Sequence, residues 1–416
     1  MIQAYRELFS IHRATLIQSL AAVLLAGQVF LADLDFDTIG LASAGGLDLA
    51  KWVLLAPFLL LPPLVLPVVS RALPRALARS PQGWMTVWLM WSMVTLFWSL
   101  SPRQTVLQGL GIVGLWLTAV WFVTVFGWGR FAMVTVATAT VFLVIGIFAD
   151  LAAGNLSLAG EDRFTGLAFG PTNLARYSTI TLILAATLWQ RGLWARRLAM
   201  VALPVSTIVL LGTNTRTVLA ALPIALLIVL GRNRGWRSAA AVATVCFALG
   251  MAFVSMGGAS SEALSRTDDP TDAGSWNGRT TIWPIALNFI ERSPMVGYGT
   301  GSGEDLWVEA AKEGEIWWFA YTSHNLFIDL ALANGITGLV LFVAGLAAFF
   351  RRWRRQFTPW LDALVVAILV GGVTEAVVNR PSLTVIALAA AMAQRGLPAD
   401  ELTDSPERAR STPVAP

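Results

Sequence analysis

The sequence is poor in the residues from which most soluble enzymes build their sites. Only 13% of its 416 residues are charged, against about 25% in a typical soluble domain. It has one cysteine, Cys246, which excludes a disulfide within the chain and a cysteine-based metal site. Its two histidines, His12 and His324, are too few for a histidine-rich metal site. Nucleophile-elbow and phosphate-binding glycine-loop motifs are also missing.

Most of the chain consists of apolar residues. Hydrophobic residues make up 56% of the chain, and its 18 tryptophans suit a protein with many membrane–water boundaries. A membrane-spanning helix needs about 20 mostly apolar residues, and about twelve segments approach that requirement. They are residues 14–32, 49–69, 84–100, 106–126, 131–150, 173–189, 198–211, 217–230, 239–256, 324–350, 360–378 and 382–393. We therefore predict an all-α membrane protein over residues 1–396, followed by a polar, disordered cytoplasmic tail over residues 397–416.

The positions of the arginines predict the orientation of these helices. Lys and Arg are enriched in cytoplasmic loops, and every second loop is basic when the N-terminus, with Arg6 and Arg13, is cytoplasmic. Both termini then lie in the cytoplasm. The longest outer loop, residues 257–323, falls between the ninth and tenth helices, and we expect it to be partly helical. A cleaved signal peptide is an alternative for the first apolar segment, and it leaves the side of every later loop unchanged.

The long outer loop contains Arg279, the first candidate for a polar site. Thr280 or Thr281 is a candidate N-cap of a helix over residues 282–292, so Arg279 is expected just before a helix N-terminus. Free N–H groups and the helix dipole favour an anion there, and a guanidinium adds a bidentate phosphate contact. An arginine that only reaches the lipid headgroups is the alternative.

His324 is the second candidate. Thr322 and Ser323 are good capping residues, which places His324 in the first turn of the next helix. The helix dipole there disfavours a charged imidazolium, and a neutral imidazole is a usable general base. Asn325 is placed to orient a hydroxyl group. A histidine that caps the helix or binds headgroups is the alternative.

Arg216, in the segment GTNTRT, is the third candidate, and it opens a helix on the outer side. An arginine so close to the hydrocarbon, against the charge bias of the loops, needs a partner. An anionic ligand and a structural pair with Glu375 or Asp329 are both open.

Two acidic groups in the long loop have no assigned role. Asp268, Asp269 and Asp272 fit a solvated loop tip. The acidic run over residues 304–315 alternates with apolar residues, which suits either an amphipathic lid over a site or a plain solvated helix.

Four stretches of sequence resemble the O-antigen ligase and polymerase family of bacterial envelope glycosyltransferases. They are GR-x3-W-x2-AL-x2-I-x-R-x-P-x2-GYG-x-G at residues 278–301, HN-x-FI-x-LAL-x-NG-x2-GL at residues 324–339, RFTGLAFGPTNLA at residues 163–175 and TNTRT at residues 213–217. The last departs from the Ser-Arg pair of many members. Each motif is weak alone, and the Arg–GYG–HN combination, in that order and on the outer side, is moderately specific.

The resemblance implies a GT-C-like membrane glycosyltransferase. Such an enzyme moves a glycan from undecaprenyl diphosphate, at the periplasmic face of the inner membrane, to lipid A–core or to a growing O-antigen or exopolysaccharide chain. It needs no metal or cofactor, and we expect one inverting displacement. Membrane lipids and chain-length or assembly proteins are the expected partners, and nucleic acid is not. By matching motifs, the catalytic residues are His324, Arg279 and Arg216, and the substrate-binding candidates are Arg163, Asn173, Arg292, Tyr298 and Asn325.

A transporter or flippase of a lipid-linked glycan is the alternative function. Such proteins tend to have inverted repeats, broken helices and polar sites at the membrane midplane. This sequence has no evident repeat, and its ionisable residues lie near the outer ends of the apolar segments. The pattern therefore favours the enzyme.

Overall fold

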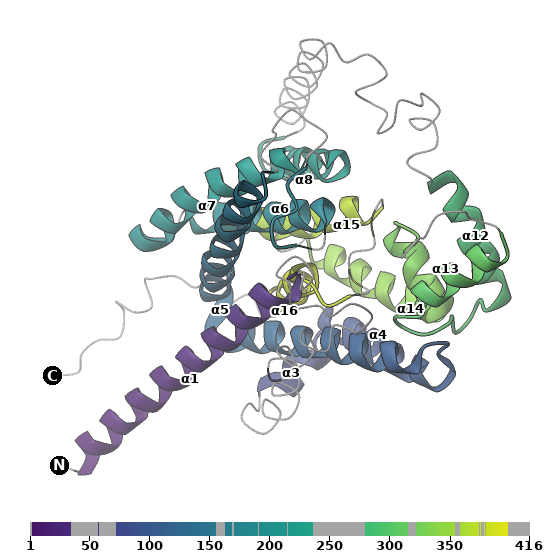
Figure 1. Cartoon of the computed structure of the whole chain (residues 1–416). Coiled ribbons are helices and arrows are strands. Elements are labelled where there is room, and N and C mark those ends of the chain that lie inside the picture. Colours follow the sequence, from purple (N-terminus) through teal and green to yellow (C-terminus); the bar gives the residue numbers. More distant parts are fainter. Residues whose placement is uncertain are drawn as a thin grey trace.

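The structure is a computed structural model that describes residues 2–34, 57, 72–154, 163–168, 170–189, 191–213, 215–235, 279–314, 322–353, 358–373, 375, 378 and 380–397. Its helices are α1 (Ile2–Ala32), α3 (Ala72–Ala78), α4 (Gln82–Val94), a 3-10 turn (Thr95–Trp98), α5 (Pro102–Ala152), α6 (Pro171–Leu188), α7 (Leu193–Gly212), α8 (Arg216–Arg234), α12 (Arg279–Arg292), α13 (Gly303–Lys312), α14 (Leu326–Trp353), α15 (Pro359–Gly372) and α16 (Leu383–Gly396). Within these ranges the only β-type pairing is an isolated bridge between Leu34 and Ala168. The predicted all-α class is confirmed (Figure 1).

Three of the described helices, α5, α7 and α14, are long and apolar enough to cross a membrane. Shorter apolar helices cover Ile17–Ala32, Thr217–Ile228, Pro359–Gly372 and Leu383–Gly396. The predicted segment 239–256 and nearly all of segment 49–69 lie outside the described residues, as do residues 257–278, with Asp268, Asp269 and Asp272, and residues 398–416. The count of twelve spans and the loop layout therefore stay predictions.

The predicted segments 106–126 and 131–150 belong to one helical element, α5. It bends at Gly127, whose φ of 81° interrupts the helix. At about 1.5 Å per residue, the 51 residues of α5 have a length of about 77 Å measured along the bent helix axis. This length is more than twice the roughly 30 Å thickness of a membrane's hydrocarbon core. Figure 1 shows the two arms leaving the bend in different directions, so one element supplies two of the predicted spans.

The C-terminal helix α16 lies at the centre of the molecule. Nearly all of its side chains are buried, and it contacts α1, α5, α6, α14 and α15. A helix that is apolar on all sides is expected to be enclosed by other helices, and Figure 1 shows α16 viewed along its axis among its neighbours. The neighbouring helices thus pack around α16 as a buried, mostly apolar centre.

Helix α14 is interrupted at Gly335, whose φ is 66°. Backbone groups of the loop after α12 form hydrogen bonds with the carbonyl groups next to this interruption. The N–H groups of Tyr298 and Gly299 donate to the carbonyls of Leu332 and Ala333 at 2.8 and 2.9 Å. Backbone groups freed by a helix break need new partners when they are buried, so the GYG segment repairs the break in α14.

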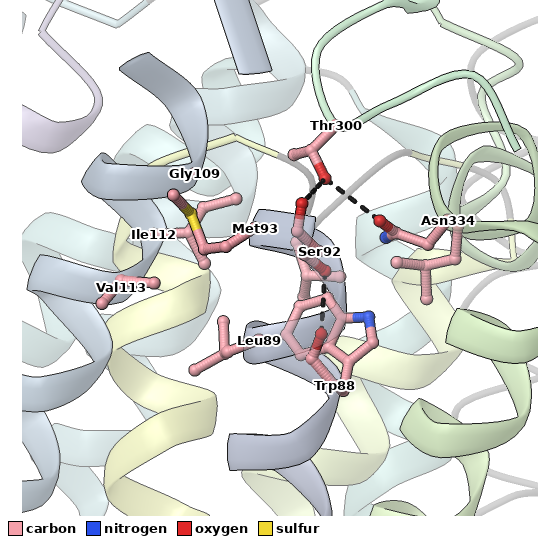
Figure 2. A pocket seen from close by; sticks show the side chains of 11 residues that line it. Trp88, Leu89, Ser92, Met93, Gly109, Ile112, Val113, Thr300 and Asn334 are labelled. Atoms are coloured by element: carbon pink, nitrogen blue, oxygen red, sulfur yellow. Dashed lines mark hydrogen bonds between the residues drawn. The ribbon is translucent and has the colours of Figure 1, made fainter. Parts of the chain in front are cut away.

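The same loop is anchored to α4 by Thr300. Its hydroxyl lies 3.1 Å from Oδ1 of Asn334 and 3.4 Å from the carbonyl oxygen of Ser92. Figure 2 shows these groups at the edge of a small apolar cavity lined by Trp88 and Leu89 among others. The cavity has no charged lining residue, so it belongs to the packing beneath the outer loop.

The acidic helix α13 is amphipathic. Leu306, Trp307 and Ala310 are buried in a small separate core that they share with α12. Glu304, Asp305 and Glu309 are exposed. Both sequence-based alternatives expected this pattern, and α12 is the element that covers the apolar side.

Replacing Gly335 with Ala tests the joint between the outer loop and α14. A Cβ atom there would lie 2.2 Å from the carbonyl oxygen of Met295, and the backbone has a conformation open mainly to glycine. Such a conformation costs other residues about 1–3 kcal/mol before the clash is counted. We expect Gly335→Ala to lower the melting temperature and the folded yield in detergent strongly. The control is Gly371→Ala, where a helical Cβ meets no heavy atom within 4 Å; equal melting temperatures for the two variants would contradict the prediction.

Candidate functional site

The ends of several helices meet in one polar cluster. Glu375 follows α15, Arg279 begins α12, His324 precedes α14, Arg176 lies in the first turns of α6, and Asp33 follows α1. Hydrogen bonds and charge interactions with Glu375 and Asp33 connect these residues. All five lie at helix ends on the side predicted to be outer, so the structure assembles charge at one end of the helices.

Glu375 is the centre of this cluster. Its Oε1 atom accepts a hydrogen bond from Nη2 of Arg279 at 2.9 Å, and its Oε2 atom lies 3.1 Å from Nδ1 of His324. The Arg279 side chain is only 10% exposed, whereas the His324 side chain is 41% exposed. One carboxylate therefore holds a buried guanidinium beside an accessible imidazole.

Burial of Glu375 by itself raises the pKa of its carboxyl group. A hydrogen bond from His324 and the positive charges of Arg176 and Arg279 outweigh burial, and the pKa of Glu375 lies below its ordinary value. Glu375 is thus an anion at neutral pH. When Nδ1 of His324 donates its proton to this anion, Nε2 is left as an acceptor.

The position of His324 differs from the prediction. It lies before α14, which begins at Leu326, and its φ of 53° falls in the left-handed region. This conformation is uncommon outside glycine and requires support. The hydroxyl of Thr322 supplies part of it by accepting the N–H of His324 at 3.2 Å. Because His324 is outside the helix, Glu375 orients its ring and the helix dipole has the smaller influence.

Asn325 is the residue that caps α14. Its Oδ1 atom accepts the N–H groups of Phe327 and Ile328 at 2.9 and 3.1 Å, which is N-capping geometry. Its Nδ2 group donates to the carbonyl of Val373 at 2.9 Å. The side chain expected to orient a hydroxyl therefore ties the start of α14 to the segment that carries Glu375.

Arg279 also differs from its expected place, because α12 begins at this residue and not after it. The prediction relied on Thr280 or Thr281 as a cap. The ion pair with Glu375 holds the first turn instead, a tertiary contact that local sequence does not contain. The predicted last residue of the helix, Arg292, is confirmed.

Arg216 is the first residue of α8, as predicted, with Thr215 at the N-cap position. Its side chain lies outside the described part of the structure. Of the two carboxylates proposed as its structural partner, Glu375 binds Arg279 and His324.

Arg163 contacts the turn that precedes Arg216. Its Nε atom donates to the carbonyl of Thr213 at 2.7 Å, and its Nη2 atom donates to the hydroxyl of Thr215 at 2.8 Å. These bonds attach the loop after α5 to the start of α8. Arg163 thus supports the backbone at Arg216.

Sequence reasoning missed Arg176. Oδ1 of Asn173 accepts a hydrogen bond from its Nη2 atom, and its charge helps to lower the pKa of Glu375. The available signal was the one used for Arg216, an arginine in the first turns of an apolar helix on the outer side. Its place within the predicted span 173–189 concealed it.

Arg292 and Tyr298 are not brought to the cluster. Arg292 ends α12, about 20 Å along the helix from Arg279, and its guanidinium lies over the ring of Phe289. The hydroxyl of Tyr298 donates to the carbonyl of Phe289 at 2.9 Å. Their described contacts are structural.

The arrangement combines two chemical capacities. The guanidinium of Arg279 favours an anion, and the half-exposed imidazole of His324 offers an acceptor for a proton. Among the described residues, no group of three His, Cys, Asp or Glu side chains has the geometry of a metal site.

Comparison with known proteins bears on the same region. Residues 199–343 match the family model described as O-antigen ligase. A segment of 70 residues, 16% of this chain, is 40% identical to the ComP-specific O-oligosaccharyltransferase of Acinetobacter baylyi and covers 12% of that protein's length. The matched region contains Arg216, Arg279 and His324, and the resemblance to the O-antigen ligase family is confirmed over residues 199–343.

Proposed function

We propose that the protein is a metal-independent, inverting glycosyltransferase. It moves a glycan from undecaprenyl diphosphate to an acceptor hydroxyl at the periplasmic face of the bacterial inner membrane. The observation that carries this proposal is the bridge that Glu375 makes between Arg279 and His324. It places a cation for a diphosphate beside a base for a hydroxyl.

The base in this mechanism is His324. Nε2 takes the proton from the acceptor hydroxyl while the oxygen attacks the anomeric carbon. Glu375 accepts the Nδ1 hydrogen bond, which fixes the neutral tautomer with Nε2 as the acceptor, and it stabilises the imidazolium that forms. General base catalysis of this kind contributes roughly 10²–10⁴-fold.

The leaving group in this mechanism is undecaprenyl diphosphate. The bond between the anomeric carbon and the diphosphate oxygen breaks as the new glycosidic bond forms, and negative charge grows on the diphosphate. Arg279 and Arg216 neutralise that charge, and preorganised groups of this type contribute roughly 10²–10³-fold each. Arg163 contributes indirectly by holding the turn at the start of α8.

The acceptor class covers lipid A–core, a growing O-antigen or exopolysaccharide chain, and a protein. The relative in Acinetobacter baylyi is named as an O-oligosaccharyltransferase, which fits transfer to a hydroxyl oxygen. All of these acceptors require the same base and the same leaving-group cations.

The rival function, a transporter or flippase of a lipid-linked glycan, has one observation in its favour, since α5 and α14 are both broken helices. The break in α14 is filled by backbone of the outer loop and therefore does not present free groups to an ion. The charged cluster at one end of the helices favours the enzyme.

Replacing His324 with Ala tests the base assignment. We expect transfer to fall at least about 100-fold because the substitution removes the imidazole assigned as the general base. The measurement is glycan transfer from the lipid carrier by the purified protein in liposomes. Unchanged transfer would exclude His324 as the base, and movement of the glycan across the bilayer without a new covalent bond would favour the flippase.

Replacing Arg279 with Lys tests the leaving-group role. A lysine keeps the charge but lacks the planar fork that contacts both Glu375 and a phosphate, so we expect at least about a tenfold loss of transfer. The matched control is Arg103→Lys, at an exposed arginine near the start of α5. Equal activity of the two variants would contradict the leaving-group role and leave Arg279 with a structural role only.

Acid conditions test the charge of Glu375. Its pKa is lowered in the folded protein, so its stabilising contribution is complete above the pKa of the unfolded chain and is lost as the pH falls through the folded pKa. We expect the melting temperature of the wild type to approach that of Glu375→Gln as the pH is lowered from 7 to 3. A constant difference between the two proteins over this range would show that Glu375 is not an ionised partner.

A further inference from the structure

A polar cavity, distinct from the apolar cavity of Figure 2, adjoins the turn that carries His324. Its lining comes from α5, the glycine-rich loop before α13, α13, α14 and the segment before α16: Gln108, Gly299, Gly301, Gly303, Glu304, Leu306, Thr322, Asp329, Leu332, Ala333 and Arg380. Thr322 belongs to both places, because its hydroxyl accepts the N–H of His324 at 3.2 Å. The cavity and the Glu375 cluster therefore share one wall.

Asp329 is the unusual residue in this cavity. It is 5% exposed, and its Oδ1 atom accepts the N–H of Ser323 at 2.9 Å. Its Oδ2 atom is buried and accepts no hydrogen bond from any described residue. A buried carboxyl oxygen without a donor costs free energy, and native proteins satisfy nearly all such groups. The cavity therefore offers a site for a ligand that donates a hydrogen bond.

The other polar groups of the cavity define that ligand further. Arg380 supplies hydrogen-bond donors, and the amide of Gln108 supplies both a donor and an acceptor. Gly299, Gly301 and Gly303 leave one wall without side chains. Two carboxyl groups, from Asp329 and Glu304, make the cavity unfavourable for a diphosphate.

We propose that this cavity binds a sugar ring of the acceptor glycan. One hydroxyl donates to Oδ2 of Asp329, and a neighbouring hydroxyl accepts from Arg380. A sugar ring carries hydroxyls on adjacent carbons, each able to donate and to accept, so two different hydroxyls can meet Asp329 and Arg380 separately. A lone serine or threonine hydroxyl would have to contact both groups with one oxygen atom. The inference rests on the proposed function and extends it: the cations of the Glu375 cluster take the donor, and the carboxyl side of the His324 turn takes the acceptor.

The test measures binding without transfer. The full-length protein in nanodiscs is mixed with free neutral trisaccharides (gluco-, galacto- and mannotriose), and saturation-transfer NMR reports which ones bind. Asp329→Asn retains an oxygen for the N–H of Ser323 and replaces Oδ2 with an NH2 group, which donates and cannot accept. Loss of one hydrogen bond to a charged group predicts roughly tenfold weaker binding. Asp305→Asn, at an exposed carboxylate outside the cavity, is the control and should bind like the wild type.

The outcomes separate this inference from the proposed function. Binding that is weakened in Asp329→Asn and retained in Asp305→Asn supports the cavity whether or not the protein transfers a glycan, because the measurement requires no catalysis. Absence of trisaccharide binding to the wild type, or equal binding to Asp329→Asn, overturns the proposal. Asp329-dependent binding of a serine peptide in place of the sugars overturns the choice of a glycan. Should Asp329→Asn fail to fold, Gln108→Ala takes its place with the same expected direction.

Discussion

One carboxylate connects the parts of this protein on which the proposed chemistry depends. Glu375 bonds to Arg279 and His324, which lie 96 and 51 residues away from it in the chain. A buried charge is tolerated only when it is paired, and removing one partner leaves the other uncompensated. The start of α12, the turn before α14 and the segment after α15 are therefore held in one arrangement. Asn325 reinforces it by capping α14 and bonding to the backbone at Val373.

The glycines of the outer loop serve this arrangement from a distance. Gly297 and Gly335 approach each other so closely that a Cβ atom on Gly297 would lie 2.5 Å from the backbone nitrogen of Gly335. This contact lets the loop after α12 complete the broken helix α14. The break and the loop together fix where α12 and α13 pack against α14. Glycines of motifs that resemble a functional signature thus have a structural role here, and the proposed chemistry is assigned to the charged residues beside them.

The charges around His324 divide into two groups, and this division orders the proposed reaction. Arg176 and Arg279 lie in the cluster around Glu375, and their positive charges suit a diphosphate. Asp329 and Glu304 line the neighbouring cavity, and they suit neutral hydroxyl groups. The turn from Thr322 to His324 belongs to both. A base in that turn is well placed to take a proton from an acceptor in the cavity while the donor lies beside the arginines.

Local sequence determined the helical class, the apolar segments and the opening of α8 at Arg216, and it singled out Arg279 and His324 as candidates. These features depend on composition, on hydrophobic runs and on a few arginines in loops that otherwise have little positive charge. All of these can be recognised within short stretches of sequence. Only the tertiary structure decided that His324 precedes its helix, that Asn325 is the cap, that Arg176 joins the cluster, and that Glu375 unites it. Two apolar segments also proved to be arms of α5, because a single glycine suffices for the bend. The physical reason is the same throughout: partners separated by tens of residues pair through burial and charge, and that pairing leaves no local pattern in the chain.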